Sequence, residues 1–259
     1  YWDDGSQLVP PHDKNVINEV KKVQVSDIKF KGIPAMITIL GKDFDKKYLD
    51  KVKTLSLSPE AIQKEHDLRI VFTPLHGTTY ELVPASLRNW GFTNIHTVPE
   101  QSIPNGDFPT VASANPEEPA AFKMALDLAR KIDADLAMAC DPDGDRIGIA
   151  VKNDAGEWTL LNGNQTNIIF TEYIIRRKKE LNQLKGGEYT VKTIVTTELI
   201  KDIAEKNHII CYDVYTGFKW IADIIRKEGG EKFIGGGEES FGYMPGAFTR
   251  DKDGVSATS

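Results

Sequence analysis

Short apolar runs alternate with amphipathic stretches along most of this chain. From Asp67 onward each apolar run is followed by a stretch whose apolar positions recur at helical spacing, and then the next apolar run begins. This order is typical of βαβ units, in which mainly parallel strands are covered by helices. The runs that predict strands span residues 68–72, 92–98, 135–140, 191–195, 209–214 and 232–234. We therefore expect an α/β protein with mixed, mainly parallel sheets.

The first quarter of the chain follows a different pattern. Apolar side chains recur at helical spacing in residues 16–23, whereas residues 26–66 are mixed and charged. Within the charged part we expect a short strand at 33–40 and a helix near 44–54. Further on, helices are expected in residues 122–132, 168–179, 199–206 and 216–225. The length of 259 residues favours two domains.

A charged loop interrupts two apolar runs near the middle of the chain. Asp141, Asp143 and Asp145 alternate along it, and Gly144 allows the tight turn that brings their carboxylates together. Three converging carboxylates repel one another unless a cation lies between them, and carboxylate oxygens are the ligands that Mg²⁺ prefers. The loop also follows a predicted strand, and open α/β sheets bind ligands at the carboxyl ends of their strands. The pattern predicts a magnesium site.

A glycine-rich acidic stretch near the end of the chain is the second candidate for chemistry. The glycines at 235–237 free the backbone to bend sharply, and Glu238 and Ser240 offer an acceptor and a hydroxyl suited to sugar hydroxyl groups. The same residues would also fit a simple turn. Arg250 and Lys252 could supply cations for a phosphate, or they could be surface charges.

Composition narrows the class of protein. The formal net charge of −6 argues against a nucleic-acid binder, although a local basic pocket for a small anion remains open. No apolar run approaches the ~20 residues that span a bilayer, so no membrane association is expected. Cys140 and Cys211 lie far apart without a metal-binding spacing, which favours a reducing cytoplasm.

Six motifs, taken together, give the chain a specific resemblance. In order they are Thr-Pro-Leu-His-Gly-Thr, Ala-Asn-Pro-Glu-Glu-Pro, Asp-Pro-Asp-Gly-Asp-Arg, Thr-Gly-Phe-Lys, Gly-Glu-Glu-Ser-Phe-Gly and Arg-Asp-Lys-Asp-Gly. This order resembles the α-D-phosphohexomutases, the phosphoglucomutase and phosphomannomutase family, whose fold has four domains around a cleft. The resemblance implies two consecutive α/β/α domains of the phosphohexomutase type. Residues 1–40 would be the tail of the first domain with a linker, 41–160 the second domain and 161–259 the third.

The resemblance also implies roles for individual residues. Asp141, Asp143 and Asp145 would bind Mg²⁺, and Glu238 and Ser240 would contact sugar hydroxyls. The other residues that would line the cleft, the last two near phosphate, are Arg146, Thr216, Gly217, Lys219, Arg250 and Lys252. The implied substrates are glucose or mannose 1- and 6-phosphates, and a hexose bisphosphate would be the intermediate of reversible phosphoryl transfer.

The family's phosphorylated serine is not found in this sequence. Ser113 lies in Val-Ala-Ser-Ala-Asn-Pro, which imitates the nucleophile loop but lacks its histidine and lies at the second domain's Asn-Pro-Glu segment. We therefore expect no catalytic residue in this chain. It would be the central part of a longer enzyme, inactive by itself.

Two other interpretations of the aspartates stay open. Asp141 to Gly144 also resembles the nucleophile loop of haloacid-dehalogenase-like phosphatases, where Asp141 itself would accept phosphate, although such a loop usually lies near the chain start. A non-catalytic calcium module is the second alternative. An EF-hand would need glycine at loop position 6 and glutamate at position 12, where this chain has Arg146 and Lys152.

Overall fold

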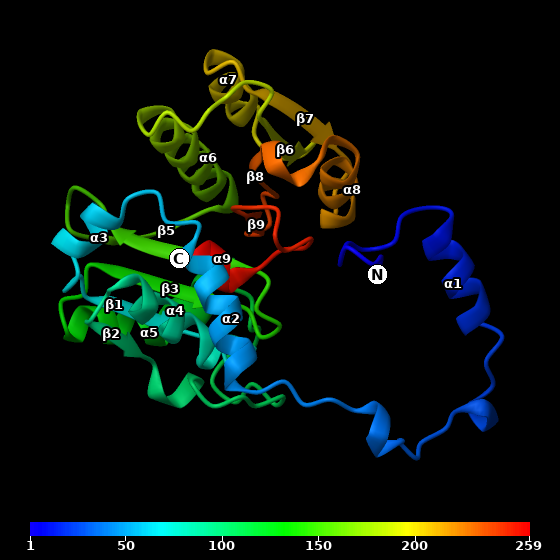
Figure 1. Cartoon of the computed structure of the whole chain (residues 1–259). Coiled ribbons are helices and arrows are strands. Elements are labelled where there is room, and N and C mark those ends of the chain that lie inside the picture. The colour runs from blue at the N-terminus through cyan, green and yellow to red at the C-terminus, as the bar shows by residue number, and fades with distance from the viewer.

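The computed structural model describes residues 1–259 and shows two lobes, each built on its own sheet (Figure 1). Sheet A has the strand order β2-β1-β3-β4-β5. Its members are β1 (Ile70–Thr73), β2 (Ile95–Thr97), β3 (Leu136–Cys140), β4 (Ile147–Lys152) and β5 (Trp158–Leu161). Strands β2, β1 and β3 are parallel, whereas β4 and β5 form antiparallel hairpins at one edge.

Sheet B repeats this plan in the second lobe, with the order β7-β6-β8-β9. Its members are β6 (Tyr189–Thr193), β7 (Ile210–Val214), β8 (Phe233–Gly237) and β9 (Tyr243–Met244). Strands β7, β6 and β8 are parallel and β9 is antiparallel. The predicted fold class, α/β with mixed and mainly parallel sheets, is therefore confirmed.

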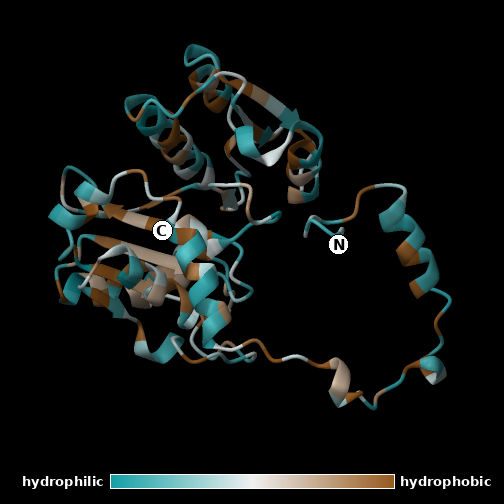
Figure 2. Cartoon of the chain, viewed as in Figure 1, coloured by the Kyte–Doolittle hydropathy of each residue, from teal (hydrophilic) through white to brown (hydrophobic).

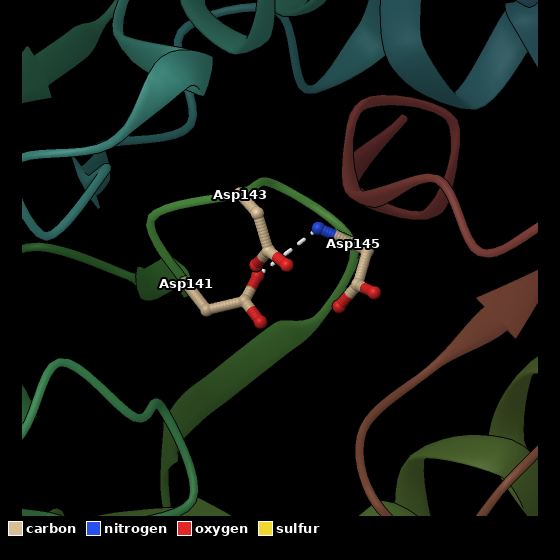
Figure 3. A group of neighbouring side chains, drawn as sticks. All are labelled: Asp141, Asp143 and Asp145. Carbon is tan, nitrogen blue, oxygen red and sulfur yellow. Dashed lines mark hydrogen bonds between the residues drawn. The ribbon is translucent and has the colours of Figure 1, made fainter. Parts of the chain in front are cut away.

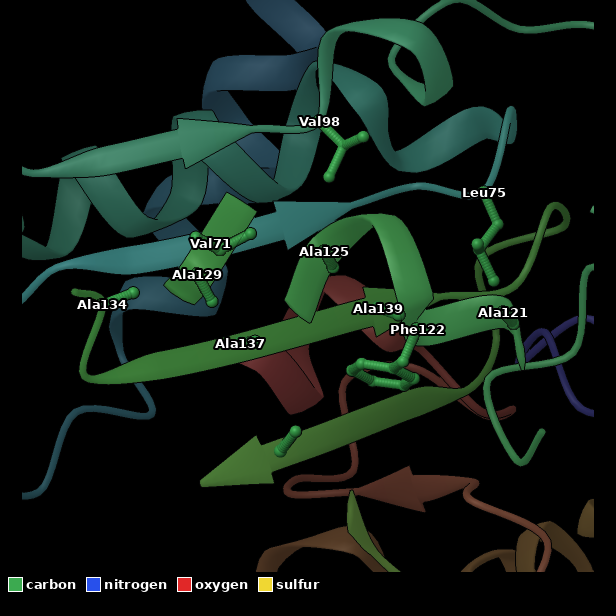
Figure 4. Packing of buried hydrophobic residues seen from close by; sticks show 11 residues of the cluster. Val71, Leu75, Val98, Ala121, Phe122, Ala125, Ala129, Ala134, Ala137 and Ala139 are labelled. Carbon is green, nitrogen blue, oxygen red and sulfur yellow. The ribbon is translucent and has the colours of Figure 1, made fainter. Parts of the chain in front are cut away.

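Helices cover both faces of each sheet, because apolar side chains project from both faces of the buried parallel strands. In the first lobe these are α2 (Lys42–Lys53), α3 (Pro59–Lys64), α4 (Leu82–Trp90) and α5 (Pro119–Lys131); in the second they are α6 (Gly163–Glu180), α7 (Leu199–Lys206) and α8 (Phe218–Glu228). Four apolar clusters result, one on each face of each sheet. Figure 4 shows the cluster under α5, where Phe122 is fully buried over small alanines of β3. Burying one such ring contributes roughly 1.5–3 kcal/mol.

The C-terminal helix α9 (Gly254–Thr258) returns to the first lobe, although it follows the strands of the second. Val255 joins the cluster of Ile70 and Phe72 on sheet A. The hydroxyl groups of Ser86 in α4 and Ser259 lie 2.6 Å apart. The two lobes are thus tied together by the last residues of the chain.

The N-terminal segment loops away from both lobes (Figure 1). Helix α1 (His12–Val20) forms where the spacing predicts one, but it buries no residue. The expected strand at 33–40 is wrong: these residues are exposed and contain only the short 3₁₀ helix η2 (Pro34–Met36), the second after η1 (Val25–Asp27). A strand needs a neighbour to pair with, and none lies beside this segment. Figure 2 shows apolar stretches along it.

The very start of the chain contacts the second lobe. The Gln7 amide donates to Asp251 at 2.6 Å, the guanidinium of Arg226 lies 4.4 Å from the ring centre of Trp2, and Asp13 lies 3.4 Å from Lys219.

No helix of the chain combines the length and apolar character that crossing a bilayer requires.

Candidate functional site

The aspartate loop, residues 141–146, joins β3 to β4 at the carboxyl end of β3. Asp141 Oδ1 accepts hydrogen bonds from the backbone N–H groups of Asp145 (3.0 Å) and Arg146 (2.9 Å), so the loop curls around this carboxylate. Gly144 supplies the left-handed turn at φ +79°. One oxygen of each aspartate lies within 4.8 Å of the others (Figure 3). The structure therefore brings the three predicted metal ligands together.

Two cations partly balance the charge of these aspartates. Arg146 Nε lies 3.2 Å from Asp141 Oδ2, and Lys252 Nζ lies 2.8 Å from Asp145 Oδ2. Burial raises the pKa of Asp141 to about 7. The hydrogen bond from the backbone N–H of Arg146 lowers this pKa, whereas the negative charges of Asp145 and Asp143 raise it further. A buried carboxylate with a raised pKa between like charges is a characteristic of functional sites.

Arg146 is held by residues of the Ala-Asn-Pro-Glu-Glu-Pro motif. Its Nη1 lies 3.3 Å from Glu117 Oε1 and 3.4 Å from Asn115 Oδ1. Neither Glu117 nor Asn115 has a role predicted from the sequence. The sequence feature that could have indicated them is the guanidinium of Arg146, a group with several donors that needs more than one acceptor. The Ser113 hydroxyl donates to Glu118 at 2.8 Å.

The Thr-Pro-Leu-His-Gly-Thr loop packs directly on the aspartate loop. The backbone N–H of Thr78 donates to Pro142 O at 2.8 Å. A Cβ at Gly77 would lie 2.3 Å from Pro142 Cα, a distance too short for two carbon atoms that are not bonded to each other. Leu75 and His76, just before this glycine, adopt positive φ values of 47° and 63° while buried. Glycine is therefore required for the close approach of these two loops.

The glycine-rich stretch differs from its expected shape. Gly235 to Gly237 do not form the sharp bend, because they belong to β8: Gly236 and Gly237 pair with β6 and β9, and Gly235, with φ +140°, lies at a register irregularity between β8 and β6. The bend falls in the next five residues, 238–242, which we call the acidic turn, and Phe241 has the positive φ of 65°. The absence of side chains on the glycines serves close packing: a Cβ at Gly237 would lie 2.0 Å from Asn167 Oδ1.

Glu238 connects the acidic turn with the Thr-Gly-Phe-Lys motif. Its Oε1 accepts the backbone N–H of Gly217 at 2.5 Å, and Gly217 has φ +116°. Burial raises the pKa of Glu238, while the Gly217 N–H and the charge of Lys252 oppose this effect. Two motifs that are distant in the sequence therefore meet at one buried carboxylate.

The aspartate loop and the acidic turn lie against each other at the junction of the lobes. The backbone N–H of Ile147 donates to Phe241 O at 3.0 Å, and that of Gly254 donates to Gly144 O at 2.9 Å. Lys252, from the second lobe's tail, reaches Asp145 in the first. The predicted metal ligands and the predicted sugar-binding residues thus share one site.

The remaining predicted cleft residues differ in their contacts and in their exposure to solvent. Lys219 pairs with Asp13 of the N-terminal segment, and Thr216 is exposed. The Nη1 atom of Arg250 is buried without a hydrogen-bond partner. It packs beside Gly230, where a Cβ would lie 3.7 Å from Nη1, and not beside the aspartates.

Both lobes are similar to known proteins. Residues 46–156 match the family model "Phosphoglucomutase/phosphomannomutase, alpha/beta/alpha domain II", and residues 162–259 match domain III of the same family. A phosphoglucomutase of Staphylococcus saprophyticus is 34% identical over 264 residues, covering 98% of this chain and 47% of that protein. A phosphomannomutase of Mycoplasmoides pirum is 34% identical over 263 residues, covering 100% of this chain and 47% of that protein.

Similarity in structure extends to more distant proteins. N-acetylphosphoglucosamine mutase of Aspergillus fumigatus, solved in complex with GlcNAc-6P and magnesium, has a TM-score of 0.54 at 13% identity. The match covers 82% of this chain and 49% of that one, and at this identity it shows the fold alone. The chain spans about half the length of the curated relatives that it matches, 47% for the two named above.

Proposed function

The chain belongs to the phosphoglucomutase/phosphomannomutase family, and from this premise we propose that it supplies the metal-binding and sugar-binding parts of a phosphohexomutase active site. The observation that carries the proposal is the junction itself, where the three aspartates lie beside the acidic turn. Reversible phosphoryl transfer on a hexose phosphate needs charge neutralisation and sugar recognition at one place.

The aspartate loop fits Mg²⁺. Its donor set consists of carboxylate oxygens, which this hard cation prefers, and Asp145 Oδ1 is buried without a hydrogen-bond partner. The ammonium of Lys252 already lies on Asp145 Oδ2, so the position suits a positive charge. Asp141, Asp143 and Asp145 would hold the ion, which would supply neutralisation of the phosphoryl group's negative charge.

The other residues of the junction recognise the substrate in this proposal. Glu238 and Ser240 accept from and donate to the sugar hydroxyls, while Arg146, Thr216, Gly217 and Lys219 line the cleft. Arg250 and Lys252 supply the positive charge for the phosphate. The substrates are glucose or mannose 1- and 6-phosphates, with a hexose bisphosphate intermediate. Relatives of both names, a phosphoglucomutase and a phosphomannomutase, are equally similar to the chain, so both sugars belong to the proposal.

The phosphoryl donor lies outside this chain in our proposal. A phosphoserine in another domain gives its phosphoryl group to the hexose phosphate, and after the bisphosphate reorients, the other phosphate returns to the serine. The share of 47% of the relatives' length and the hydrogen bond that engages Ser113 support this division. Residues 1–259 alone are expected to be inactive. Free Cys140 and Cys211 fit the cytoplasmic location that we also propose.

Metal binding is the first test. Titration of Mg²⁺ into the chain by calorimetry should show binding that Asp143→Asn weakens about tenfold or more, because one of the three carboxylates is lost. Asp154→Asn, in the exposed turn between β4 and β5, is the matched control and should leave the affinity unchanged. An Asp143→Asn affinity equal to that of the unmodified chain would rule out the site.

Turnover is the second test. Purified residues 1–259 should not convert glucose 1-phosphate to glucose 6-phosphate, with or without glucose 1,6-bisphosphate and Mg²⁺, because the phosphoserine is absent. Conversion above the level of an Asp143→Asn control would show that this chain carries its own phosphoryl donor. The proposal that the phosphoryl donor lies outside this chain would then be wrong.

The contacts of Asp141 weigh against the phosphatase alternative. One oxygen accepts two backbone N–H groups and the other faces Arg146, so neither is directed as a free nucleophile. Intact-protein mass spectrometry after incubation with acetyl phosphate tests this alternative. Stable addition of a phosphoryl group that Asp141→Asn abolishes would favour the phosphatase.

A further inference from the structure

Lys192 is a fully buried lysine in the middle of the second lobe. It lies on β6, its side chain has no solvent exposure, and its Nζ lies 2.5 Å from Asp213 and 2.8 Å from Glu198. The same Nζ donates to the carbonyl oxygen of Thr196 at 3.2 Å. Burial alone lowers the pKa of Lys192, but the two carboxylates outweigh it and leave that pKa raised. The lysine therefore stays charged and fixes the turn after β6.

The residues that follow β6 hold the acidic turn in place. Glu239 Oε2 accepts the hydroxyl of Thr196 at 3.0 Å and that of Thr193 at 3.2 Å, and the backbone N–H of Glu239 donates to Thr196 Oγ1 at 3.2 Å. The two threonine hydroxyls also contact each other at 2.7 Å. Glu239 is thus fastened by both its side chain and its backbone to a threonine whose carbonyl is held by Lys192.

The attachment of Glu239 bears on its two neighbours. Glu239 is bonded to the turn after β6 through its side chain and its backbone N–H, so the backbone that carries Glu238 and Ser240 is held at this point. Glu238 is bonded to a different element, since its Oε1 accepts the N–H of Gly217. From the other flank, Asn167 Nδ2 donates to the carbonyl oxygen of Glu238 at 2.9 Å.

We propose that Lys192, Thr196 and Glu239 are positioning residues that orient Glu238 and Ser240 for sugar hydroxyls. The inference deepens the proposed function and rests on it for the identity of the ligand. Thr196 is the link that can be tested most cleanly, because its hydroxyl receives the Glu239 N–H and contacts the Glu239 carboxylate while its carbonyl accepts from Lys192. None of the three residues needs to touch the sugar.

The first experiment needs no ligand. Amide hydrogen exchange, resolved by residue with NMR, should show the Glu239 amide exchanging at least tenfold faster in Thr196→Val, because valine removes its acceptor. The Glu238 amide donates to Gly242 O and should change little. Thr190→Val is the matched control: it removes a buried hydroxyl from β6, the strand just before Thr196, but one that donates to Gly235 O. Unchanged exchange at Glu239 in Thr196→Val would overturn the anchor.

Rescue separates a hydroxyl effect from general damage. Thr196→Ser keeps the hydroxyl and should restore slow exchange at Glu239, and Lys192→Met should accelerate exchange in the same direction as Thr196→Val. If Thr190→Val accelerates Glu239 as much as Thr196→Val does, the effect is loss of stability in the lobe and the proposal is wrong.

The second experiment measures ligand binding. Thr196→Val should weaken calorimetric binding of glucose 1-phosphate about tenfold and leave the affinity for inorganic phosphate unchanged, while Thr196→Ser binds both normally. Equal weakening of both ligands, or of neither, would overturn the positioning role. If the unmodified chain binds glucose 1-phosphate no better than inorganic phosphate, the proposed sugar site fails. The exchange data still decide whether Thr196 anchors Glu239.

Discussion

The two lobes use the same strand plan and place their chemistry at the same point of it. In sheet A, with the order β2-β1-β3-β4-β5, pairing changes from parallel to antiparallel at β4, and in sheet B, with the order β7-β6-β8-β9, it does so at β9. The loop that leads into the antiparallel strand is the aspartate loop in one lobe and the acidic turn in the other. Two topologically equivalent hairpins thus meet at the junction, one suited to a cation and the other to hydroxyl groups.

The two hairpins differ in what holds them. In the aspartate loop the Asp141 carboxylate is held from within, since it accepts two backbone N–H groups of the same loop, while Thr78 and Gly254 contact the loop from outside. The acidic turn is held largely by other elements: Thr196 after β6, Asn167 on α6 and Gly217 before α8. A locally organised loop should tolerate disturbance of its surroundings better than one that depends on distant contacts.

The largest expected effect tests this difference with two glycines. Gly163→Ala places a Cβ 1.8 Å from Glu239 O, and Gly77→Ala places one 2.3 Å from Pro142 Cα. Overpacking should cost about 3 kcal/mol of unfolding free energy in each variant, measured by urea denaturation. Because the two hydrogen bonds to Asp141 lie within the aspartate loop and move with it, Gly77→Ala should lower Mg²⁺ affinity less than Gly163→Ala lowers glucose 1-phosphate affinity.

Gly106→Ala is the control for both glycines, because a Cβ there meets nothing within 4 Å and the backbone is not in the left-handed region. It should leave stability and both affinities unchanged. Equal losses of Mg²⁺ and sugar phosphate binding in the Gly77 and Gly163 variants would contradict the distinction between the two hairpins.

A smaller effect is expected at the ion pair that joins the two lobes. Lys252→Met removes the ammonium that lies 2.8 Å from Asp145 Oδ2 and should raise the Mg²⁺ affinity of the isolated chain about three- to tenfold, because a competing positive charge is lost. Calorimetry at constant ionic strength measures it. Lys131→Met, an exposed lysine at the end of α5, controls for the change in net charge. Weaker Mg²⁺ binding in Lys252→Met would show that the lysine supports the loop.

The smallest expected effect is a pH-dependent gain of stability in Asp141→Asn without metal. Because the pKa of Asp141 is raised in the folded state to about 7, its charge opposes folding progressively from its unfolded pKa up to that value. Asn at this position should therefore stabilise the chain by about 1 kcal/mol at pH 8 and by much less at pH 4.5. Thermal unfolding in EDTA, with Asp154→Asn as control, measures the difference. A gain that is equal at both pH values would contradict the assigned pKa.

The sequence by itself determined the elements of both lobes and the aspartate cluster. The period of apolar positions is a local property, so the strand before the aspartates and helix 199–206 were predicted closely. The aspartates alternate within five residues of one loop, and their convergence also follows from local backbone geometry. The expected strand at 33–40 failed because a strand depends on a pairing partner, which no local pattern supplies.

Only the tertiary structure decided how the motifs combine. Nothing local in the sequence indicates that Glu238 accepts the N–H of Gly217, that Lys252 reaches Asp145, or that Lys192 and Thr196 fix Glu239. Such contacts join residues on different strands and lobes, and they require the assembled sheets and the packing of α9 against sheet A. The convergence of the three aspartates therefore follows largely from the local sequence, because they lie in one short loop, whereas the shape of the acidic turn depends on contacts from other elements.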